Sequence, residues 1–401
     1  MSEGKAILVV NCGSSSLKYE VYDMPLGTSL GKGTVERIGM GTGNISQSSP
    51  KGVFKKDAEI PDHAKAMDLV KEAMTDPEKG IVTTLREIVG VGHRVVHGGE
   101  EYSESVIIDD KVLEAIKNNI ELAPLHNPAN LTGIKESMNA MPGVPQVAVF
   151  DTAFHQTIQP ASYLYGIPYE LYEKFKIRKY GFHGTSHRFV SAEAMRMLQR
   201  SKTNTNVISA HLGNGASITA IAQGKSVDTS MGFTPLEGLI MGTRSGDIDP
   251  AIIFYLIDRG YSPEELNSML NKKSGLLGIS GVSNDMRDLL EASKNGNARA
   301  EAALEVFAHR VRRYIGAYMA DLVKVDALIF TGGVGQHDYE MRERICRRLE
   351  NLGIVMDYQK NIENRSKPGI ISADYSPVTI IVIPTNEELQ IAMDAHKLIY
   401  G

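Results

Sequence analysis

Two short loops rich in glycine, serine and asparagine have the residue types that bind anions. The first, residues 13–16, offers the hydroxyls of Ser14 and Ser16 and is followed by Lys18. The second, residues 213–217, has an asparagine amide in place of the lysine. Glycine lets an anion approach the backbone closely, and successive N–H groups form an anion-binding concavity. Each loop alone could be no more than a tight hairpin turn, but two loops in matching positions favour binding of a polyphosphate.

Two arginines flanked by glycines could add a clamp for a carboxylate or a phosphate. Arg94 lies in the run GHRVVHGG at residues 92–99, and Arg244 lies in GTRSGD at residues 242–247. The planar guanidinium matches the paired oxygens of both anions. A structural ion pair is the simpler interpretation for either arginine taken alone, so the sequence leaves both roles open.

Two acidic residues are candidates for holding a metal ion. Asp151 comes directly after the apolar residues 147–150, and Glu387 opens the last helical segment. Mg²⁺ takes few protein ligands when it also binds phosphates, so two carboxylates from separate segments can be enough. Capping is the alternative for both acids, since acidic side chains are favoured in the first turn of a helix.

Several other site motifs are excluded. His183 and His187 have the spacing of some zinc sites, but Gly184 occupies the position where the zinc-protease motif needs a glutamate. Residues 224–226 match the end of a Gly-x4-Gly-Lys-Ser/Thr phosphate loop, but Thr219 occupies its leading position. A Gly-x-Gly-x-x-Gly run opening a helix, the protein-kinase motifs and the Gly-x-Ser-x-Gly hydrolase motif are absent from the sequence.

The elements that must position these residues follow an alternating pattern of strands and helices. Apolar residues 6–10 and 207–210 each run into one of the glycine-rich loops, and residues 17–22 and 218–221 return, which predicts two β-hairpins of one style. This repetition suggests an internal duplication and two related α/β lobes. Open α/β sheets bind ligands at the carboxyl ends of their strands, where these loops lie.

Further patterns fill in the rest of the fold. The other predicted strands cover residues 91–96, 147–150, 327–330 and 378–383, and helical patterns include residues 110–122 and 298–323. Residues 39–52, rich in glycine and serine, are predicted to form an exposed loop. Thr385, with Glu388 three residues later, predicts the start of the last helix.

Length and composition narrow the class of protein. A chain of 401 residues suggests two or three domains. The net charge is −5 and no basic stripe is present, which argues against a nucleic-acid partner. Cys12 and Cys346 are too few for a disulfide framework, and no apolar run approaches the roughly 18 residues of a membrane span. The first residues lack the features of a signal peptide, so we expect a cytoplasmic protein without nucleic-acid or membrane partners.

Six motifs in this order resemble the acetate kinases, that is, the acetokinase family within the superfamily of acetate kinases, sugar kinases and actin-like ATPases. The motifs are NCGSSSLK at residues 11–18, GHRVVHGG at 92–99, FDTAFH at 150–155, YGFHGTSH at 180–187, HLGNGAS at 211–217 and TNEE at 385–388. The resemblance runs essentially from Lys5 to the C-terminus. It implies a two-lobed, duplicated, actin-like (ribonuclease-H-like) α/β fold with a cleft between the lobes. We therefore expect an N-terminal lobe over residues 1–150, joined by the helix of residues 385–401, and a nucleotide-binding lobe over residues 151–384.

The resemblance also implies an activity and partners. The family transfers a phosphoryl group reversibly from ATP to acetate, giving acetyl phosphate and ADP by direct in-line transfer. It depends on Mg²⁺, which Mn²⁺ can replace, and it usually forms homodimers. We expect the same of this chain.

The family's functional residues fall on four groups of positions. The catalytic residues are Asp151, His183, Arg244 and Arg94. The residues that bind acetate are Arg94, Val96, Leu125, Phe182 and Pro235. The residues that bind the nucleotide are Asn11, Ser14, Ser16, Lys18, His211, Leu212, Gly213, Asn214, Gly215, Asp285, Met286, Arg287, Gly333, Val334 and Gly335. The metal-associated residues are Asn11 and Glu387, beside Asp151.

One departure from the family pattern keeps an alternative open. The family typically shows Gly-Glu-Asn where this sequence has Gly335-Gln336-His337. The lost negative charge leaves the nucleotide preference open, and with it a different phosphoryl donor such as pyrophosphate.

Other hypotheses assign a different substrate or a different class of protein. A kinase for propionate or another short-chain acid is the nearest, although Val96 at the pocket favours acetate. A non-catalytic regulator would need a DNA-binding helix-turn-helix, which the start of this sequence lacks. An actin-like filament protein would not need Arg94, Arg244 and His183 together.

Overall fold

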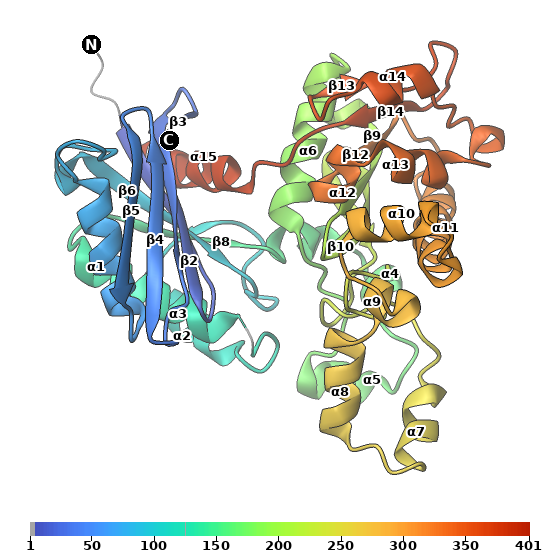
Figure 1. Cartoon of the computed structure of the whole chain (residues 1–401), viewed down its shortest axis with the longest axis horizontal. Helices are drawn as coiled ribbons and strands as arrows, with labels where there is room; N and C mark the ends of the chain where they lie inside the picture. Colours follow the sequence, from blue (N-terminus) through green and yellow to red (C-terminus); the bar gives the residue numbers. More distant parts are fainter. Residues whose placement is uncertain (1–4, 125) are drawn as a thin grey trace. The chain divides into compact units, whose positions relative to one another are not determined.

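The computed structural model describes residues 5–124 and 126–401. The chain divides into two compact units, coloured along the sequence in Figure 1. Unit 1 consists of Met1–Phe154 and Asn386–Gly401, and unit 2 consists of His155–Thr385. Each unit is built on one mixed β-sheet with helices packed against it, so the predicted α/β class is confirmed.

The sheet of unit 1 has eight strands in the order β5-β4-β3-β2-β1-β6-β8-β7. Their bounds are β1 Lys5–Cys12, β2 Ser16–Met24, β3 Thr28–Glu36, β4 Thr42–Ser49, β5 Gly52–Glu59, β6 Ile88–Val95, β7 Val106–Ile107 and β8 Gln146–Phe150. The strands from β1 to β5 pair antiparallel in succession, whereas β1, β6 and β8 are parallel. The carboxyl ends of these three parallel strands therefore lie at one edge of the sheet, next to Arg94 and Asp151.

Alternating side chains of β1 form two cores in unit 1. Leu8 and Val10 pack on the face covered by α1 (His63–Met74) and α3 (Asn127–Ala140). Ile7 and Val9 pack on the other face, against α15 (Glu387–Tyr400). A Cβ on Gly92 would lie 2.5 Å from Ile391 Cγ2, so this glycine in β6 is what lets α15 approach the sheet. The remaining helical segments are η1 Leu85–Glu87, α2 Asp110–Asn118 and η2 Ala153–Thr157.

The sheet of unit 2 has six strands in the order β11-β10-β9-β12-β14-β13. Their bounds are β9 Asn206–Leu212, β10 Ala216–Ala222, β11 Lys225–Thr229, β12 Ala327–Thr331, β13 Gly369–Ile370 and β14 Thr379–Val382. The run β11-β10-β9-β12-β14 has the same order and strand directions as β3-β2-β1-β6-β8 in unit 1. This agreement confirms the duplicated fold that the two glycine-rich hairpins suggested.

Helices make up most of the rest of unit 2. Their bounds are α4 Pro160–Tyr163, α5 Tyr169–Phe175, α6 Gly184–Met197, α7 Ala251–Ile257, α8 Pro263–Lys272, α9 Gly275–Ser280, α10 Met286–Lys294, α11 Ala298–Asp321, α12 Gly332–His337, α13 Tyr339–Cys346 and α14 Tyr358–Glu363, with the short 3₁₀ segments η3 Lys202–Asn204 and η4 Glu350–Leu352. The longest helix, α11, packs its buried face on β9 and β10, and α6 packs on β9 and β12. No helix in the described part of the chain has the length and apolarity that crossing a membrane requires.

Two predictions about local structure are wrong. Residues 39–52 are not a loop, because they contain β4, which turns Gly43, Ile45 and Gln47 inward and leaves polar residues outside. The last helix is capped by Asn386, whose side chain accepts a hydrogen bond from the Leu389 N–H. The hydroxyl of Thr385, the predicted cap, instead hydrogen-bonds with that of Ser186.

Candidate active site

In unit 1, Arg94 forms an ion pair with Asp151. Adjacent parallel strands bring them together, because Val95 pairs with Phe150 and the Asp151 N–H donates to the Val95 carbonyl. Arg94 Nε lies 3.1 Å from both carboxylate oxygens of Asp151, and Nη2 lies 2.6 Å from Oδ2. The Asp151 carboxylate raises the pKa of Arg94 above its ordinary value, with Glu387 adding to the effect, so the guanidinium is a permanent charge.

Glu387, the first residue of α15, is the second carboxylate at Arg94. Its Oε2 lies 4.0 Å from Arg94 Nε. Burial raises the pKa of Glu387 to about 7, although Arg94 acts in the opposite direction. Asn386 fixes this end of α15, because its Oδ1 also accepts a hydrogen bond from the Tyr22 hydroxyl. We call Arg94, Asp151 and Glu387 the Arg94 cluster.

The oxygen donors of the Arg94 cluster suit a hard divalent cation. Mg²⁺ binds carboxylates and keeps several waters when phosphates complete its coordination. The described residues contain no group of three or more His, Cys, Asp or Glu side chains that could hold a metal on its own. Asp151 and Glu387 therefore fit a metal that is bound together with a phosphate, and not a closed all-protein site.

The loop after β6 is held by two buried asparagines of α3 that the sequence analysis did not single out. Asn130 Oδ1 accepts a hydrogen bond from the Val96 N–H, and Asn127 Oδ1 accepts one from the His97 N–H. Asn130 also donates to the carbonyl of Cys12, so it ties this loop to the end of β1. Val96 is buried, and the predicted acetate-pocket residue Leu125 lies outside the described residues.

The first glycine-rich loop joins β1 and β2. The Gly13 N–H donates to the Ser16 carbonyl and closes the turn, which leaves Ser14 exposed. Asn11 and Lys18 are paired across the two strands, and both line a cavity of about 520 Å³ on this face of the sheet. The structure thus places these predicted phosphate-binding residues together at the end of β1.

In unit 2, the side chains of His183 and Arg244 both lie close to Gly215. A Cβ on Gly215 would lie 3.5 Å from His183 Nε2 and 3.8 Å from Arg244 Nη1. His183 is the N-cap residue of α6 and has a left-handed backbone, with φ of 55°. Its ring stacks on that of His211 with the centroids 4.3 Å apart. We call these four residues the His183 cluster.

Arg244 differs from Arg94 in its partners. Its Nη1 donates to the Pro235 carbonyl at 3.2 Å, and no carboxylate of the described residues lies within ion-pair distance. Burial lowers the pKa of Arg244, but an arginine stays charged. A partly buried cation without an acidic partner is suited to an incoming anion. The structural ion pair that the sequence left open is therefore present at Arg94 and absent at Arg244.

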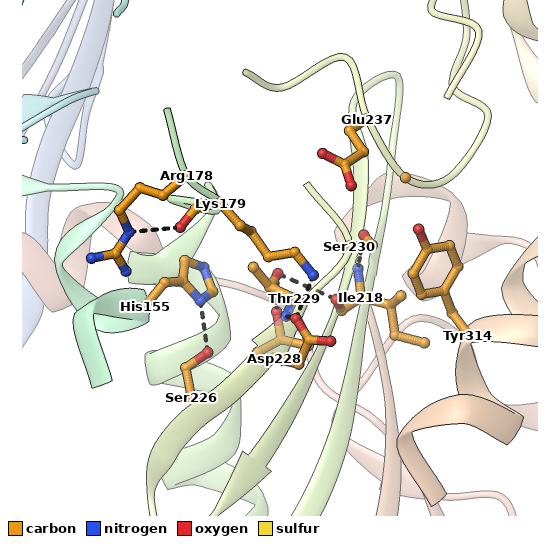
Figure 2. A network of polar contacts seen from close by, with 12 residues as sticks. His155, Arg178, Lys179, Ile218, Ser226, Asp228, Thr229, Ser230, Glu237 and Tyr314 are labelled. Carbon is orange, nitrogen blue, oxygen red and sulfur yellow. Dashed lines mark hydrogen bonds and ion pairs between the residues drawn. The ribbon is translucent and has the colours of Figure 1, made fainter. Parts of the chain in front are cut away.

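Polar contacts hold the segment that leads to Arg244, and two of the residues that make them, Glu237 and Tyr314, are labelled in Figure 2. The Tyr165 hydroxyl donates to the Glu237 carboxylate, and the Gly238 N–H donates to Asp247 Oδ1 at 2.8 Å. The Tyr314 hydroxyl donates to the other oxygen of Asp247. Burial raises the pKa of Glu237. These contacts restrict the loop at Glu237 and at Asp247, on both sides of the arginine.

The predicted nucleotide-binding residues of unit 2 lie in and near the second glycine-rich loop. Asn214 Oδ1 accepts a hydrogen bond from Asn284 Nδ2, and a Cβ on Gly213 would lie 3.9 Å from the Gly333 nitrogen. Asp285 caps α10 and pairs with Arg287 at 2.6 Å, and its hydrogen bonds to Arg287 lower the pKa of Asp285 to about 2. The remaining predicted members lie in the same loops and helix starts: Leu212, Met286, Val334 and Gly335.

Gln336 and His337, which depart from the family pattern, form hydrogen bonds within unit 2. Gln336 Nε2 donates to the Ser366 carbonyl at 3.1 Å, and His337 Nδ1 lies 2.6 Å from Ser366 Oγ. Both side chains therefore bind the segment after α14. Phe182, from the predicted acetate pocket, is buried, and its carbonyl accepts a hydrogen bond from His155 Nε2.

Comparison with known proteins assigns the chain to a family. A family model described as the acetokinase family matches residues 6–393. An acetate kinase of Desulfitobacterium hafniense (strain DSM 10664 / DCB-2) is 56% identical over 396 residues, which cover 98% of this chain and 99% of that protein. The crystal structure of Porphyromonas gingivalis acetate kinase matches with a TM-score of 0.95 at 45% identity, over 98% of this chain and 99% of the other.

A second solved structure is also similar. It is a propionate kinase from Francisella tularensis subsp. tularensis SCHU S4, with a TM-score of 0.92 at 46% identity over 98% of this chain and 100% of the other. The match in sequence and fold extends over both sheets and over the segments that carry the Arg94 and His183 clusters. By these criteria the chain belongs to the acetokinase family.

Proposed function

We propose that this chain transfers a phosphoryl group reversibly from ATP to acetate, giving acetyl phosphate and ADP. The observation that carries this proposal is the His183 cluster, where Arg244, which has no acidic partner among the described residues, and His183 lie close to one glycine of a phosphate-type loop. The chain's membership of the acetokinase family supports the same reaction. The acetate kinase structure that matches the chain agrees with it.

The chemistry of the reaction fits these residues. Acetate is ionised at pH 7, because carboxyl pKa values lie near 4, so the nucleophile needs no general base. The difficulty is to bring one anion to another, and phosphoryl transfer is mostly positioning and charge stabilisation. In this proposal Arg94 orients the acetate carboxylate, while Arg244 and His183 stabilise the oxygens of the group in transfer by an in-line path.

Asp151 and Glu387, with Asn11, are the proposed ligands of a divalent cation, which we take to be Mg²⁺ with Mn²⁺ as a substitute. When bound, Mg²⁺ neutralises charge on the phosphates. Metal binding needs a deprotonated carboxylate, so a cation would compete with the proton that the raised pKa of Glu387 favours. Asn11, Ser14, Ser16, Lys18, Asn214 and Gly333 are the proposed contacts of the nucleotide phosphates and adenosine.

A second acceptor deserves a direct test, because a propionate kinase is among the similar structures. Val96, Phe182 and Pro235 are the proposed pocket for the methyl group of acetate, and the bulk of Val96 favours the shorter acid. The decisive assay traps the acyl phosphate with hydroxylamine, using ATP with acetate, propionate or butyrate. We expect the highest kcat/KM with acetate. A higher value with propionate would make the chain a propionate kinase.

The same assay tests the phosphoryl donor. Gln336 and His337 lack the negative charge that the family carries there, which is the reason to compare ATP with pyrophosphate. We expect product only with the nucleotide. Product with pyrophosphate and none with ATP would overturn the nucleotide assignment while leaving the acyl acceptor in place.

We also propose a homodimer that uses the outer face of α7. This helix has the sequence AIIFYLI and buries none of its residues in the chain. Phe254 is 67% exposed and Tyr255 is 56% exposed, and Ile252 and Ile257 are exposed as well. An apolar helix face of this kind marks an interaction surface, and a second copy of the chain is the partner that the family's usual homodimer supplies.

We propose a cytoplasmic location as well. Cys12 and Cys346 are buried free thiols that form no disulfide in the described part of the chain, which agrees with a reducing compartment.

A further inference from the structure

A line of hydrogen bonds in unit 2 ends at His183. Ser209 Oγ of β9 lies 2.9 Å from His187 Nδ1, and His187 Nε2 lies 2.8 Å from Ser217 Oγ of β10. Ser217 Oγ in turn lies 2.9 Å from His183 Nδ1. Ser209, His187 and Ser217 are completely buried. None of these three residues has a role in the function proposed above.

The middle histidine of this line is neutral. Burial lowers the pKa of His187 well below its ordinary value, and the nearby rings of His155 and His211 lower it further. A neutral imidazole has one N–H and one lone pair. His187 therefore donates to one of its two serines and accepts from the other.

The position of one hydroxyl proton sets the direction of the whole line. Among the described residues, the only side-chain partner of Ser209 Oγ is His187 Nδ1. A buried hydroxyl that leaves its proton unpaired is unfavourable, so Ser209 donates to Nδ1. His187 then carries its proton on Nε2 and donates to Ser217. The hydroxyl proton of Ser217 is left for its other partner, Nδ1 of His183.

We propose that Ser217 and His187 are positioning residues that fix His183 as the neutral tautomer with its proton on Nε2. Accepting at Nδ1 also restrains the rotation of the ring, which leaves Nε2 on the side of Gly215 and Arg244. The Nε2–H group can then donate to an anion beside Arg244 without adding a second positive charge there. The catalytic meaning of this arrangement rests on the proposed function, but the tautomer itself does not.

The tautomer can be measured in the wild-type protein without any substrate. Protonated and unprotonated imidazole nitrogens have well-separated ¹⁵N shifts, so selective ¹⁵N-histidine labelling reports each ring at pH 8. The signals of His183 are assigned from their absence in His183→Gln. We expect His183 to be protonated on Nε2 and His187 to be protonated on Nε2. A proton on His183 Nδ1, in either the neutral or the charged ring, would overturn the proposal.

Kinetics then test whether the line acts through His183. We expect Ser217→Ala to lower kcat roughly tenfold or more, with the KM values for ATP and acetate changed less than about threefold. In a His183→Ala background the same substitution should have almost no further effect, because the residue it positions is gone. Equal effects of Ser217→Ala in both backgrounds would show a merely structural role.

A matched control is available at another buried serine. Ser137 Oγ of α3 is completely buried and donates to Gln146 Oε1 at 3.0 Å, and neither residue belongs to the proposed site or to the line of hydrogen bonds. Ser137→Ala removes a buried serine hydrogen bond of the same kind and should leave the His183 shifts unchanged and kcat within about threefold. An equal loss of kcat in Ser137→Ala and Ser217→Ala would contradict the proposal. If wild type forms no acyl phosphate, the proposed function fails, while the NMR result on the tautomer is unaffected.

Discussion

Arg94 and Arg244 look alike in the sequence, each beside glycines, but the structure gives them different electrostatic settings. The charge of Arg94 is compensated by Asp151, and Glu387 lies near it. Arg244 is partly buried and donates to a backbone carbonyl, and in the described part of the chain it has no carboxylate partner. A sequence motif cannot show this difference, because the partners come from segments far along the chain. Arg244, whose charge is not compensated, is therefore expected to interact more strongly than Arg94 with the negative charge that develops on the group in transfer.

Replacing Arg244 should therefore affect turnover more than binding. We expect Arg244→Ala to lower kcat by roughly 10³-fold, the scale of arginines that stabilise phosphoryl transfer. Steady-state kinetics of acyl phosphate formation measure this change. Arg196→Ala is the control, because Arg196 is exposed and pairs with Glu193 near the end of α6. A loss below tenfold in Arg244→Ala would remove the proposed role.

The proposed metal ligands give a second prediction at this scale. Asp151→Asn and Glu387→Gln each replace a charged oxygen with a neutral one of similar size, so a higher Mg²⁺ concentration should be needed for half-maximal activity. Titration of activity with Mg²⁺ measures the shift, and circular dichroism checks that the variants fold. Glu193→Gln, at a half-exposed acid of α6 outside the proposed site, should leave the titration unchanged. Wild-type titration curves in both site variants would contradict the metal assignment.

At the scale of elements, strand β6 places His93 in the core of unit 1 and Arg94 near the carboxyl end of the strand. His93 is buried and its Nε2 donates to Gln146 Oε1 at 2.7 Å. Burial lowers the pKa of His93 to about 4, against about 6.5 in the unfolded chain. Between these values the unfolded chain binds a proton that the folded chain does not, so the free energy of unfolding must fall as the pH falls.

This linkage predicts a pH-dependent difference between wild type and His93→Gln. From pH 7 to pH 4 wild type should lose about 3 kcal/mol more of its unfolding free energy than the variant, because the variant lacks the titrating group. Urea denaturation across this range measures both. The raised pKa of Glu387 has the opposite effect, because it makes the free energy of unfolding rise as the pH falls. Glu387 is present in both proteins, so its contribution cancels in the difference between them. Parallel pH curves would show that His93 has the same pKa in the folded and the unfolded chain.

The elements also show what the sequence could and could not predict. Strands β1, β2, β9 and β10 were predictable, because apolar residues alternate or cluster before a glycine-rich turn. Strand β4 was not, since TGNISQSS turns only Gly43, Ile45 and Gln47 inward and its composition is that of a loop. The motifs located the candidate site residues, but the buried supports Asn130 and Ser217 depend on contacts across the fold. No local spacing could reveal them.

At the scale of the whole molecule, duplication explains why each half of the chain carries a glycine-rich loop. Each unit repeats one sheet order, and each places its loop at the turn between its first two strands along the chain, β1 and β2 or β9 and β10. The two copies have since diverged in chemistry. Unit 1 has Lys18 and the acidic Arg94 cluster, while unit 2 has the His183 cluster, which includes Arg244. The proposed reaction needs groups from both copies, so neither unit alone should form acyl phosphate.

The exposed face of α7 gives the last prediction, on assembly. Figure 1 shows α7 and α5 toward the same end of unit 2, and α5 also leaves Tyr169 and Phe175 exposed. If this surface joins two copies, a charge in its centre must be buried without a partner, which is strongly unfavourable. We expect Phe254→Glu to change the mass measured by light scattering from dimer to monomer. Leu26→Glu, an equally drastic change at an exposed residue of unit 1, should remain dimeric. A dimeric Phe254→Glu would place the interface elsewhere, and a monomeric wild type would remove the homodimer.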